Sequence, residues 1–189
     1  MISDAVITIV GSGATGLSLA HHLIDEASKH EPARRLTIYV VDGRRHPGRG
    51  MAYEVDVDTN LMNTRASVIS PVADEPDRFW RWLQDSDEWR HEHAGIEVNE
   101  RTFVPRPLFG LYLEHFFEET CRLALANDSR VIPVRAEATD IEVMPDGSVA
   151  VITSSSLSIR SDYVFLCCGS FPSTAHGTLS GNPGFHATP

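Results

Sequence analysis

The hydrophobic pattern at the start of the chain changes from a short apolar run to a helical repeat and back. The run "AVITIV" at 5–10 is rich in β-branched residues and ends at a glycine, which is typical of a buried strand. Over residues 15 to about 27, apolar residues return at the spacing of one helix face. A second apolar run, "LTIYVVD" at 36–42, ends on an acid. Strand, helix and strand in this order predict a βαβ unit, whose parallel pairing requires a right-handed crossover.

The pattern then becomes irregular. The segment "GRRHPGRGMAYEVDVDTN" at 43–60 is rich in glycine and charge, and an insertion is predicted over residues 43 to about 105. Inside it, "DEPDRFWRWLQD" at 74–85 predicts a short helix capped by Asp74 or Asp77, whose apolar face carries Phe79, Trp80 and Leu83. Pro107 suits the first position of a longer helix, which carries at helical spacing the residues Phe109, Tyr112, Leu113 and Phe116.

The last third of the chain has the pattern of strands. Residues 131–168 alternate and break repeatedly, with a hairpin turn at 145–147. Their closing run, "YVFLCC" at 163–168, is apolar enough for the centre of a sheet buried on both faces. Residues 173–189 predict a C-terminal loop or linker. The pattern as a whole predicts an α/β fold with a central parallel sheet and a small antiparallel β-meander.

Composition narrows the class of partner and the compartment. The 189 residues are close to the length of one domain, and the formal net charge is −10. A mainly acidic surface repels nucleic acid and anionic membranes, so we expect neither as a partner. The three cysteines lack the spacing of a zinc site or a disulfide framework, which indicates a reducing compartment. Asp4 stands where a signal peptide would carry positive charge, and no apolar run approaches membrane-spanning length, so we expect a cytoplasmic protein.

A glycine pattern carries the clearest chemistry. Gly11, Gly13 and Gly16 form G-x-G-x-x-G directly between the first strand and the helix, which is the context of a dinucleotide-binding turn. The first glycine allows the tight turn, the second lets a pyrophosphate approach the backbone, and the third lets the helix pack close to the strand. The start of the helix then offers N–H groups and a partial positive charge to the phosphates.

Asp42, at the end of the second strand, completes the nucleotide signature. Its carboxylate is placed to accept hydrogen bonds from a ribose diol and would repel a 2′-phosphate, which disfavours NADP on this turn despite Arg44 and Arg45 nearby. The turn itself does not distinguish FAD from NAD, because both carry the same adenosine diphosphate half. The long insertion after Asp42 favours FAD, since a simple NAD domain usually continues into another short strand and helix.

Five short motifs in order resemble those of the bacterial FAD/NAD(P)-binding protein family: "GRGMAY", "LMNTRASVIS", "FWRWL", "FVPRPLFGLYL" and "DYVFLCCGS". That family carries G-x-G-x-A-Y, an L-x-N-x-x-A segment and a P-R-x-x-F-G-x-Y helix start in its N-terminal region. The resemblance covers about residues 5–172. It implies the Rossmann-like FAD-binding domain of two-dinucleotide-binding flavoproteins over 1–172, with an insertion at about 43–105 and a loop or linker at 173–189.

The resemblance also implies a role for each matching residue. The FAD pyrophosphate would lie on Gly11, Ser12, Gly13, Ala14, Thr15 and Gly16, while Asp42 holds the adenosine ribose. The dinucleotide would be lined by Gly50, Met51, Ala52 and Tyr53, and Asn63 would approach the isoalloxazine. Three further positions complete the set: Arg106 on a phosphate or fixing the loop, Ala136 against adenine, and Gly169 at a close backbone approach where related flavoproteins have Ala-Thr-Gly.

Other candidate groups are interpreted as structural. Cys167 and Cys168 would point to opposite faces of a strand as small buried hydrophobes rather than act as a redox pair. The "HEH" at 91–93 has no third ligand at a recognisable spacing, so we expect a solvated loop and no metal site. Core packing or a subunit interface is the expected role of three tryptophans, Trp80, Trp82 and Trp89. No general acid or base is evident, so no catalytic residue is assigned.

We expect an FAD-binding oxidoreductase module or subunit that moves electrons between NADH or NADPH and a small-molecule substrate, with monooxygenase chemistry of the N-hydroxylase kind by analogy of fold. The alternative is a non-catalytic dinucleotide-binding module or regulatory subunit of a larger flavoenzyme. No second strand, glycine turn and helix is evident for the nicotinamide. Three explanations stay open: a truncated chain, a subunit completed by a separate chain, or a self-sufficient FAD protein. Exposed apolar surface would favour a homo-oligomer or a heteromer.

Overall fold

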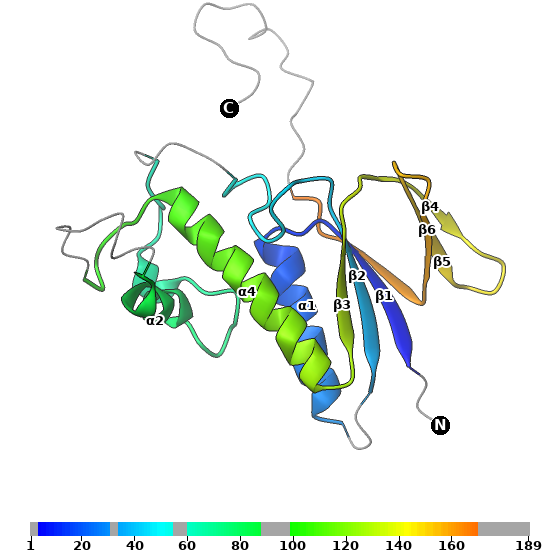
Figure 1. Cartoon of the computed structure of the whole chain (residues 1–189), viewed down its shortest axis with the longest axis horizontal. Helices are drawn as coiled ribbons and strands as arrows, with labels where there is room; N and C mark the ends of the chain where they lie inside the picture. Colours follow the sequence, from blue (N-terminus) through cyan, green and yellow to red (C-terminus); the bar gives the residue numbers. More distant parts are fainter. Residues whose placement is uncertain (1–3, 31–33, 55–59, 88–98, 170–189) are drawn as a thin grey trace, which may run out of the picture.

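The computed structural model of the chain describes residues 4–30, 34–54, 60–87 and 99–169. Its centre is a parallel sheet of four strands in the order β3-β2-β1-β7 (Figure 1). The strands are β1 (Ala5–Val10), β2 (Leu36–Val41), β3 (Arg130–Val134) and β7 (Tyr163–Leu166). The predicted βαβ unit is confirmed, because β1 and β2 pair in parallel and helix α1 (Ala14–Ser28) lies between them in the chain.

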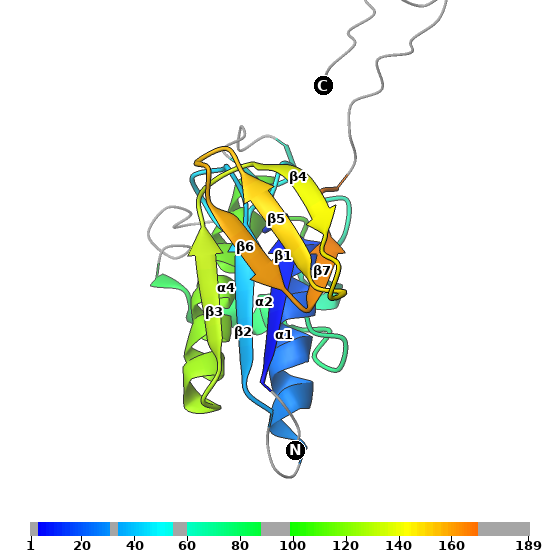
Figure 2. The ribbon, with the colours of Figure 1, turned by 90° about the vertical axis from the view of Figure 1, so that its right-hand side faces the viewer.

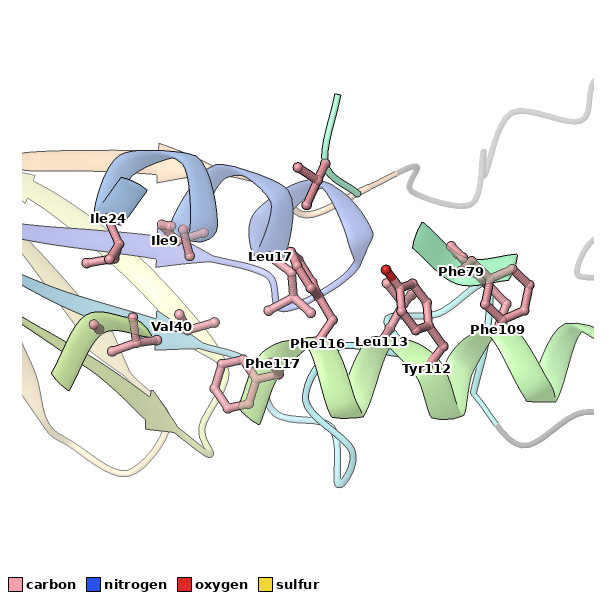
Figure 3. Close-up of a cluster of buried hydrophobic side chains, with 14 of the residues drawn as sticks. Ile9, Leu17, Ile24, Val40, Phe79, Phe109, Tyr112, Leu113, Phe116 and Phe117 are labelled. Atoms are coloured by element: carbon pink, nitrogen blue, oxygen red, sulfur yellow. The ribbon is translucent and has the colours of Figure 1, made fainter. Parts of the chain in front are cut away.

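Helices α1 and α4 (Arg106–Ala126) cover one face of this sheet (Figure 1). Helix α4 begins at Arg106, one residue earlier than predicted, and has Pro107 at its second position. The side chains between the helices and the sheet form the core (Figure 3), which includes Ile9, Leu17, Ile24, Val40, Leu113, Phe116 and Phe117. Burying a large apolar side chain contributes about 1.5–3 kcal/mol, so this layer holds α1 firmly against the strands.

The insertion contains a 3-10 turn, η1 (Ala66–Val68), and helix α2 (Arg78–Asp85). Phe79 and Leu83 of α2 are buried, as predicted, and the Phe79 ring lies 4.9 Å from the Phe109 ring of α4. The Trp80 side chain is half-buried. The Trp82 ring stacks on the Phe79 ring, with 6.1 Å between the ring centres. The aromatic side chains therefore join α2 to α4, while Trp89 and the "HEH" lie outside the described residues.

The predicted cap of α2 is half right. Asp77 occupies the position before the helix, but its side chain makes no capping hydrogen bond. Its Oδ1 instead lies 3.3 Å from Nε of Arg81, one turn later. The Asp77 carboxylate therefore pairs with Arg81 on the helix surface and does not bind the N–H groups of the first turn.

A small antiparallel sheet covers the other face of the parallel sheet (Figure 2). It is formed by β4 (Ala138–Val143), β5 (Val149–Thr153) and β6 (Ser158–Ser161). The hairpin turn predicted at 145–147 joins β4 to β5, with Gly147 at a φ of +85°. The two sheets are linked by the buried hydroxyls of Thr8 and Ser161, whose oxygens lie 2.6 Å apart. The predicted α/β fold with a β-meander is confirmed.

The prediction for "YVFLCC" is wrong. Strand β7 lies at the edge of the described sheet, where it pairs with β1 alone, and its side chains at Tyr163 and Leu166 are 60% and 64% exposed. An apolar run tells how much surface a strand can bury, but not which neighbours bury it. Cys167 and Cys168 follow the strand rather than belong to it and are only partly buried. Among the described helices, none has the length and apolar character needed to cross a bilayer.

Candidate functional site

The parallel register brings the carboxyl ends of the four strands to one edge of the sheet. Val10 is level with Val41 and Leu166, and Val41 is level with Val134. The segments that leave these strands therefore start side by side, and they contain the predicted site residues Gly11 to Gly16, Asp42, Ala136 and Gly169. In open α/β sheets this is the edge at which ligands bind.

Two glycines of the turn are required by the fold itself. Gly11 has a φ of +105°, and a Cβ added to it would lie 2.3 Å from the carbonyl oxygen of Cys167. A Cβ added to Gly16 would lie 2.1 Å from the carbonyl oxygen of Gly11. Both distances are far below any real Cβ contact, so α1 can cross the end of β1 this closely only with glycine at both positions.

Gly13 has no such structural reason to be glycine. Its φ of −67° and ψ of −179° are extended backbone, and an added Cβ would lie 3.5 Å from Cα of Gly50, which is an ordinary contact. Gly13 is the N-cap residue of α1 and has no side chain that could accept a hydrogen bond from the first turn. The first hydrogen bond of the helix runs from the N–H of Leu17 to the carbonyl of Gly13. The N–H groups of residues 14–16 are thus left without a carbonyl partner in the helix. Such N–H groups, with the partial positive charge of the helix end, are what binds a phosphate.

Asp42 ties strand β2 to this turn. Its side chain is 9% exposed, and its Oδ2 accepts hydrogen bonds from the backbone N–H and the hydroxyl of Ser12, both at 2.9 Å. Its Oδ1 accepts the backbone N–H of Arg44 at 3.0 Å, and Nη1 of Arg44 lies 3.2 Å from both oxygens. Burial by itself would raise the pKa of Asp42, but the hydrogen bonds from Ser12 and Arg44 outweigh it and hold that pKa below its usual value. The carboxylate is therefore charged at neutral pH.

A second glycine segment lies against the turn from the insertion. The backbone N–H of Gly48 donates to the carbonyl of Ser12 at 2.9 Å, and a Cβ on Gly48 would lie 2.6 Å from the carbonyl oxygen of Leu113. Gly50 has a φ of +58°, and its added Cβ would lie 2.9 Å from Cα of Gly13. Sequence reasoning missed Gly48. The spacing of the two glycines in "PGRG" is a signal that could have indicated a tight chain crossing.

Helix α4 anchors this segment through a carboxylate. Glu114 Oε1 lies 2.5 Å from Nε of Arg49 and 2.8 Å from Nδ1 of His46. The Arg49 side chain is largely buried. The ion pair of Arg49 and the contact of His46 with Glu114 fix the segment that faces Gly13 to helix α4.

Arg106, the first residue of α4, reaches the same loop. Its Nη2 donates to the carbonyl of Ala52 at 2.9 Å, and its guanidinium carbon lies 5.6 Å from the centre of the Tyr53 ring. The Tyr53 ring in turn meets Phe109 edge to face at 4.9 Å, whereas Met51 is 58% exposed. Two roles were expected for Arg106, binding a phosphate or fixing the loop. Its contacts with Ala52 and Tyr53 agree with fixing the loop.

The remaining predicted residues lie in different surroundings. Ala136 is buried just beyond the end of β3, next to the strand that carries Asp42. Asn63 is exposed, and its amide oxygen accepts the hydroxyl of Thr64 at 3.3 Å. Gly169 has a φ of +73°, and no described atom lies within 4 Å of its added Cβ. The close backbone approach to the cofactor expected at Gly169 stays a prediction, while the carbonyl oxygen of Cys167 lies over Gly11.

A cavity of about 540 Å³ opens beside the first turns of α1, lined by Ala14, Thr15, Ser18, Leu19, His22, Ser70 and Pro71. The Ser18 hydroxyl donates to the carbonyl of Pro71 at 2.7 Å, and Nδ1 of His22 lies 2.7 Å from the carbonyl oxygen of Ser18. Sequence reasoning missed this cavity, because it brings together residues some fifty positions apart. Within the described part of the chain, no group of three or more His, Cys, Asp or Glu side chains could hold a metal ion.

Comparison with known proteins agrees with this geometry. The model of the FAD-NAD(P)-binding family matches residues 8–171. The chain belongs to this family. Its cofactors are therefore of the FAD and NAD(P) class, and its fold is that of a flavoprotein-type dinucleotide-binding domain. A search of curated proteins found no match.

Solved structures similar to this member of the FAD-NAD(P)-binding family are larger proteins. A cyclohexanone monooxygenase mutant from Rhodococcus sp. Phi1, bound to NADP⁺, is 20% identical with a TM-score of 0.53, over 88% of this chain and 26% of its own. S-allyl-L-cysteine S-oxygenase from Allium sativum is 16% identical with a TM-score of 0.55, over 88% and 36%. OTEMO in complex with FAD and NADP is 12% identical with a TM-score of 0.52, over 96% and 28%. The chain thus spans about a quarter to a third of these proteins.

Proposed function

We propose that this chain holds FAD on the turn at residues 11–16 and serves as the flavin-holding part of an oxidoreductase. The observation that carries the proposal is the uncapped start of α1 beside Gly13. Three backbone N–H groups without a helical partner face a position where glycine is not needed for folding. A pyrophosphate uses both features, because it accepts the N–H groups and needs the space that a side chain would fill.

FAD, rather than NAD, is the dinucleotide proposed for this turn. The segment at residues 48–53 supports the assignment, because it lies over the turn and lengthens the cradle beyond the pyrophosphate. Gly50 and Gly13 face each other at the contact between the two segments. Tyr53, held by Arg106, ends this cradle. Ribose would be held by Asp42, with Ala136 near adenine and Asn63 toward the flavin ring.

The reaction proposed is electron transfer from NADH or NADPH to a small-molecule substrate. When bound, a flavin supplies the hydride and oxygen chemistry, while the protein supplies binding and orientation. The similar structures that have NADP bound, and those that are oxygenases, support a nicotinamide reductant and a monooxygenase reaction by analogy of fold alone. The cavity beside His22 adjoins the turn and is the place proposed for the substrate or the ring end of the cofactor.

The proposed unit is residues 1–172, working as a homo-oligomer or with a chain that completes the flavoenzyme. The edge of β7 that faces away from β1 supports this, because no strand of the described residues pairs with it and its apolar side chains are exposed, which makes it a surface suited to association. The alternative proposal is a non-catalytic subunit. It would bind the dinucleotide on the same turn, but the bound flavin would not be reduced by NADH or NADPH.

Visible absorption spectroscopy tests the function. Purified protein is reconstituted with FAD, separated from free cofactor and mixed with NADH or NADPH without oxygen. A retained flavin spectrum that bleaches with the nicotinamide supports the oxidoreductase. A retained spectrum that does not bleach favours the non-catalytic subunit, and loss of all flavin on separation contradicts FAD binding.

A further inference from the structure

The acceptor proposed for ribose is saturated by the protein's own donors. Asp42 Oδ2 already receives the N–H and hydroxyl of Ser12, Oδ1 receives the N–H of Arg44, and the Arg44 guanidinium lies 3.2 Å from both oxygens. A carboxylate offers about four lone-pair positions, so these contacts use all of them. A ribose hydroxyl can donate to Asp42 only if one of the present donors leaves.

The donors differ in how easily they can leave. The Ser12 backbone N–H belongs to the glycine turn, whose shape is fixed by the close contacts at Gly11 and Gly16. The Ser12 hydroxyl is buried, and its oxygen also accepts the backbone N–H of Gly48 at 3.4 Å. The Arg44 backbone N–H is part of the chain that leaves β2. Only the Arg44 guanidinium stands on a flexible stem, and its side chain is 35% exposed. The guanidinium is therefore the donor that a ribose would replace.

A second carboxylate is already in reach of the displaced guanidinium. Glu54 Oε2 lies 3.7 Å from Nε of Arg44, and the Glu54 side chain is 39% exposed. A small rotation of the Arg44 side chain would close this distance to a hydrogen bond while freeing one lone pair on Oδ1 of Asp42, since Oδ2 keeps both Ser12 donors. The charge of Arg44 thus stays paired in both positions.

We propose that Arg44 sets the affinity for the dinucleotide by covering the ribose-binding edge of Asp42 and moving to Glu54 when ribose binds. This inference rests on the proposed function, because it takes Asp42 as the ribose acceptor. It makes Arg44 a competitor of the ribose hydroxyls and Glu54 the group that relieves the competition. Neither residue needs to touch the flavin ring.

Matched arginine variants provide the test. Arg44→Gln removes the guanidinium from Asp42. Arg45→Gln removes the same charge from the adjacent position, so both variants lose the same long-range attraction to phosphate and differ only in the contact with Asp42. The dissociation constant for FAD is measured by fluorescence titration at one ionic strength. We expect Arg44→Gln to bind about three- to fivefold more tightly than Arg45→Gln, the range of a partly exposed ion pair. Glu54→Gln weakens binding in the native background and has no effect when combined with Arg44→Gln.

The outcomes separate this inference from the proposed function. If the native chain does not bind FAD, the proposed function fails. If the native chain binds FAD and Arg44→Gln binds no more tightly than Arg45→Gln, the competition by Arg44 is overturned. If Glu54→Gln has the same effect with and without Arg44, the role of Glu54 as the second position is overturned. Thermal unfolding of each variant confirms that the comparison is made on folded protein.

Discussion

Replacing Gly13 by alanine separates what the fold requires from what a ligand requires. The backbone at this position is extended and accepts any residue, and the new Cβ would lie 3.5 Å from Cα of Gly50. The substitution therefore creates no clash. The cost to folding is the poorer preference of alanine for the helix cap, about 0.5–1 kcal/mol, which lowers the melting temperature of a domain of this size by roughly 1–4 °C.

The effect on the dinucleotide is expected to be much larger. In the proposed site, the added methyl group would narrow the space between Gly13 and Gly50 beside the start of α1, where the pyrophosphate is expected to bind. Losing one hydrogen bond to a charged group costs about 1.5–3 kcal/mol, which corresponds to a rise of roughly ten- to 150-fold in the dissociation constant. Fluorescence titration with FAD measures this change, and circular dichroism during heating measures the loss of stability.

Two further glycine variants serve as controls. Gly147→Ala lies in the β4–β5 turn at a φ of +85° with open space around it, so it lowers stability through backbone strain and leaves FAD affinity unchanged. Gly16→Ala, whose Cβ would lie 2.1 Å from a carbonyl oxygen, is expected to disrupt the fold. A folded Gly13→Ala that binds FAD as tightly as the native chain would refute the assignment of the pyrophosphate to this turn.

Four other predictions concern Asp42, Arg106 and the edge of the sheet. Asp42→Ala weakens FAD binding more than tenfold, about 1.4 kcal/mol, and an unchanged titration contradicts the ribose assignment. Asp42→Asn lowers the melting temperature at pH 7; because the native pKa is lowered, this difference shrinks as the pH falls through it, below 3.8, and a constant difference contradicts the hydrogen-bonding account. Arg106→Ala frees the loop at Ala52 and raises the susceptibility of that loop to limited proteolysis, whereas native-like cleavage shows that other contacts hold it. Light scattering after size exclusion is expected to show an oligomer, and a monomer at all concentrations counts against association through β7.

Helices and strands were predicted correctly from the sequence where the hydrophobic pattern of the element matches its own burial. Strands β1 and β2 are short apolar runs, and helix α4 carries its buried apolar residues at helical spacing, so hydrophobic period and length were enough to find them. The prediction failed at β7, where the same kind of run lies at the edge of the described sheet. Burial of a strand depends on its neighbours in space, which its own residues do not specify.

The site shows the same division at the level of side chains. The sequence placed Asp42 correctly after β2, because the acid follows an apolar strand directly. It did not predict that the carboxylate is shared by Ser12 and Arg44, since both contacts depend on how two loops fold over one strand end. The pairing of Arg49 and His46 with Glu114 was missed for the same reason, because it joins the insertion to a helix some sixty-five residues later.

A glycine motif by itself cannot tell which of its members serve the fold and which serve a ligand. Here the contacts separate them: the close contacts at Gly11 and Gly16 would demand glycine in an empty domain of the same shape, whereas the backbone and the contacts at Gly13 would accept alanine. If a side chain clashed at all three glycines, the motif would be explained by packing alone, and no nucleotide would be needed to account for it. Because a side chain would not clash at Gly13, and because Gly13 precedes N–H groups that have no carbonyl partner in the helix, a bound phosphate accounts for more of this turn than packing does.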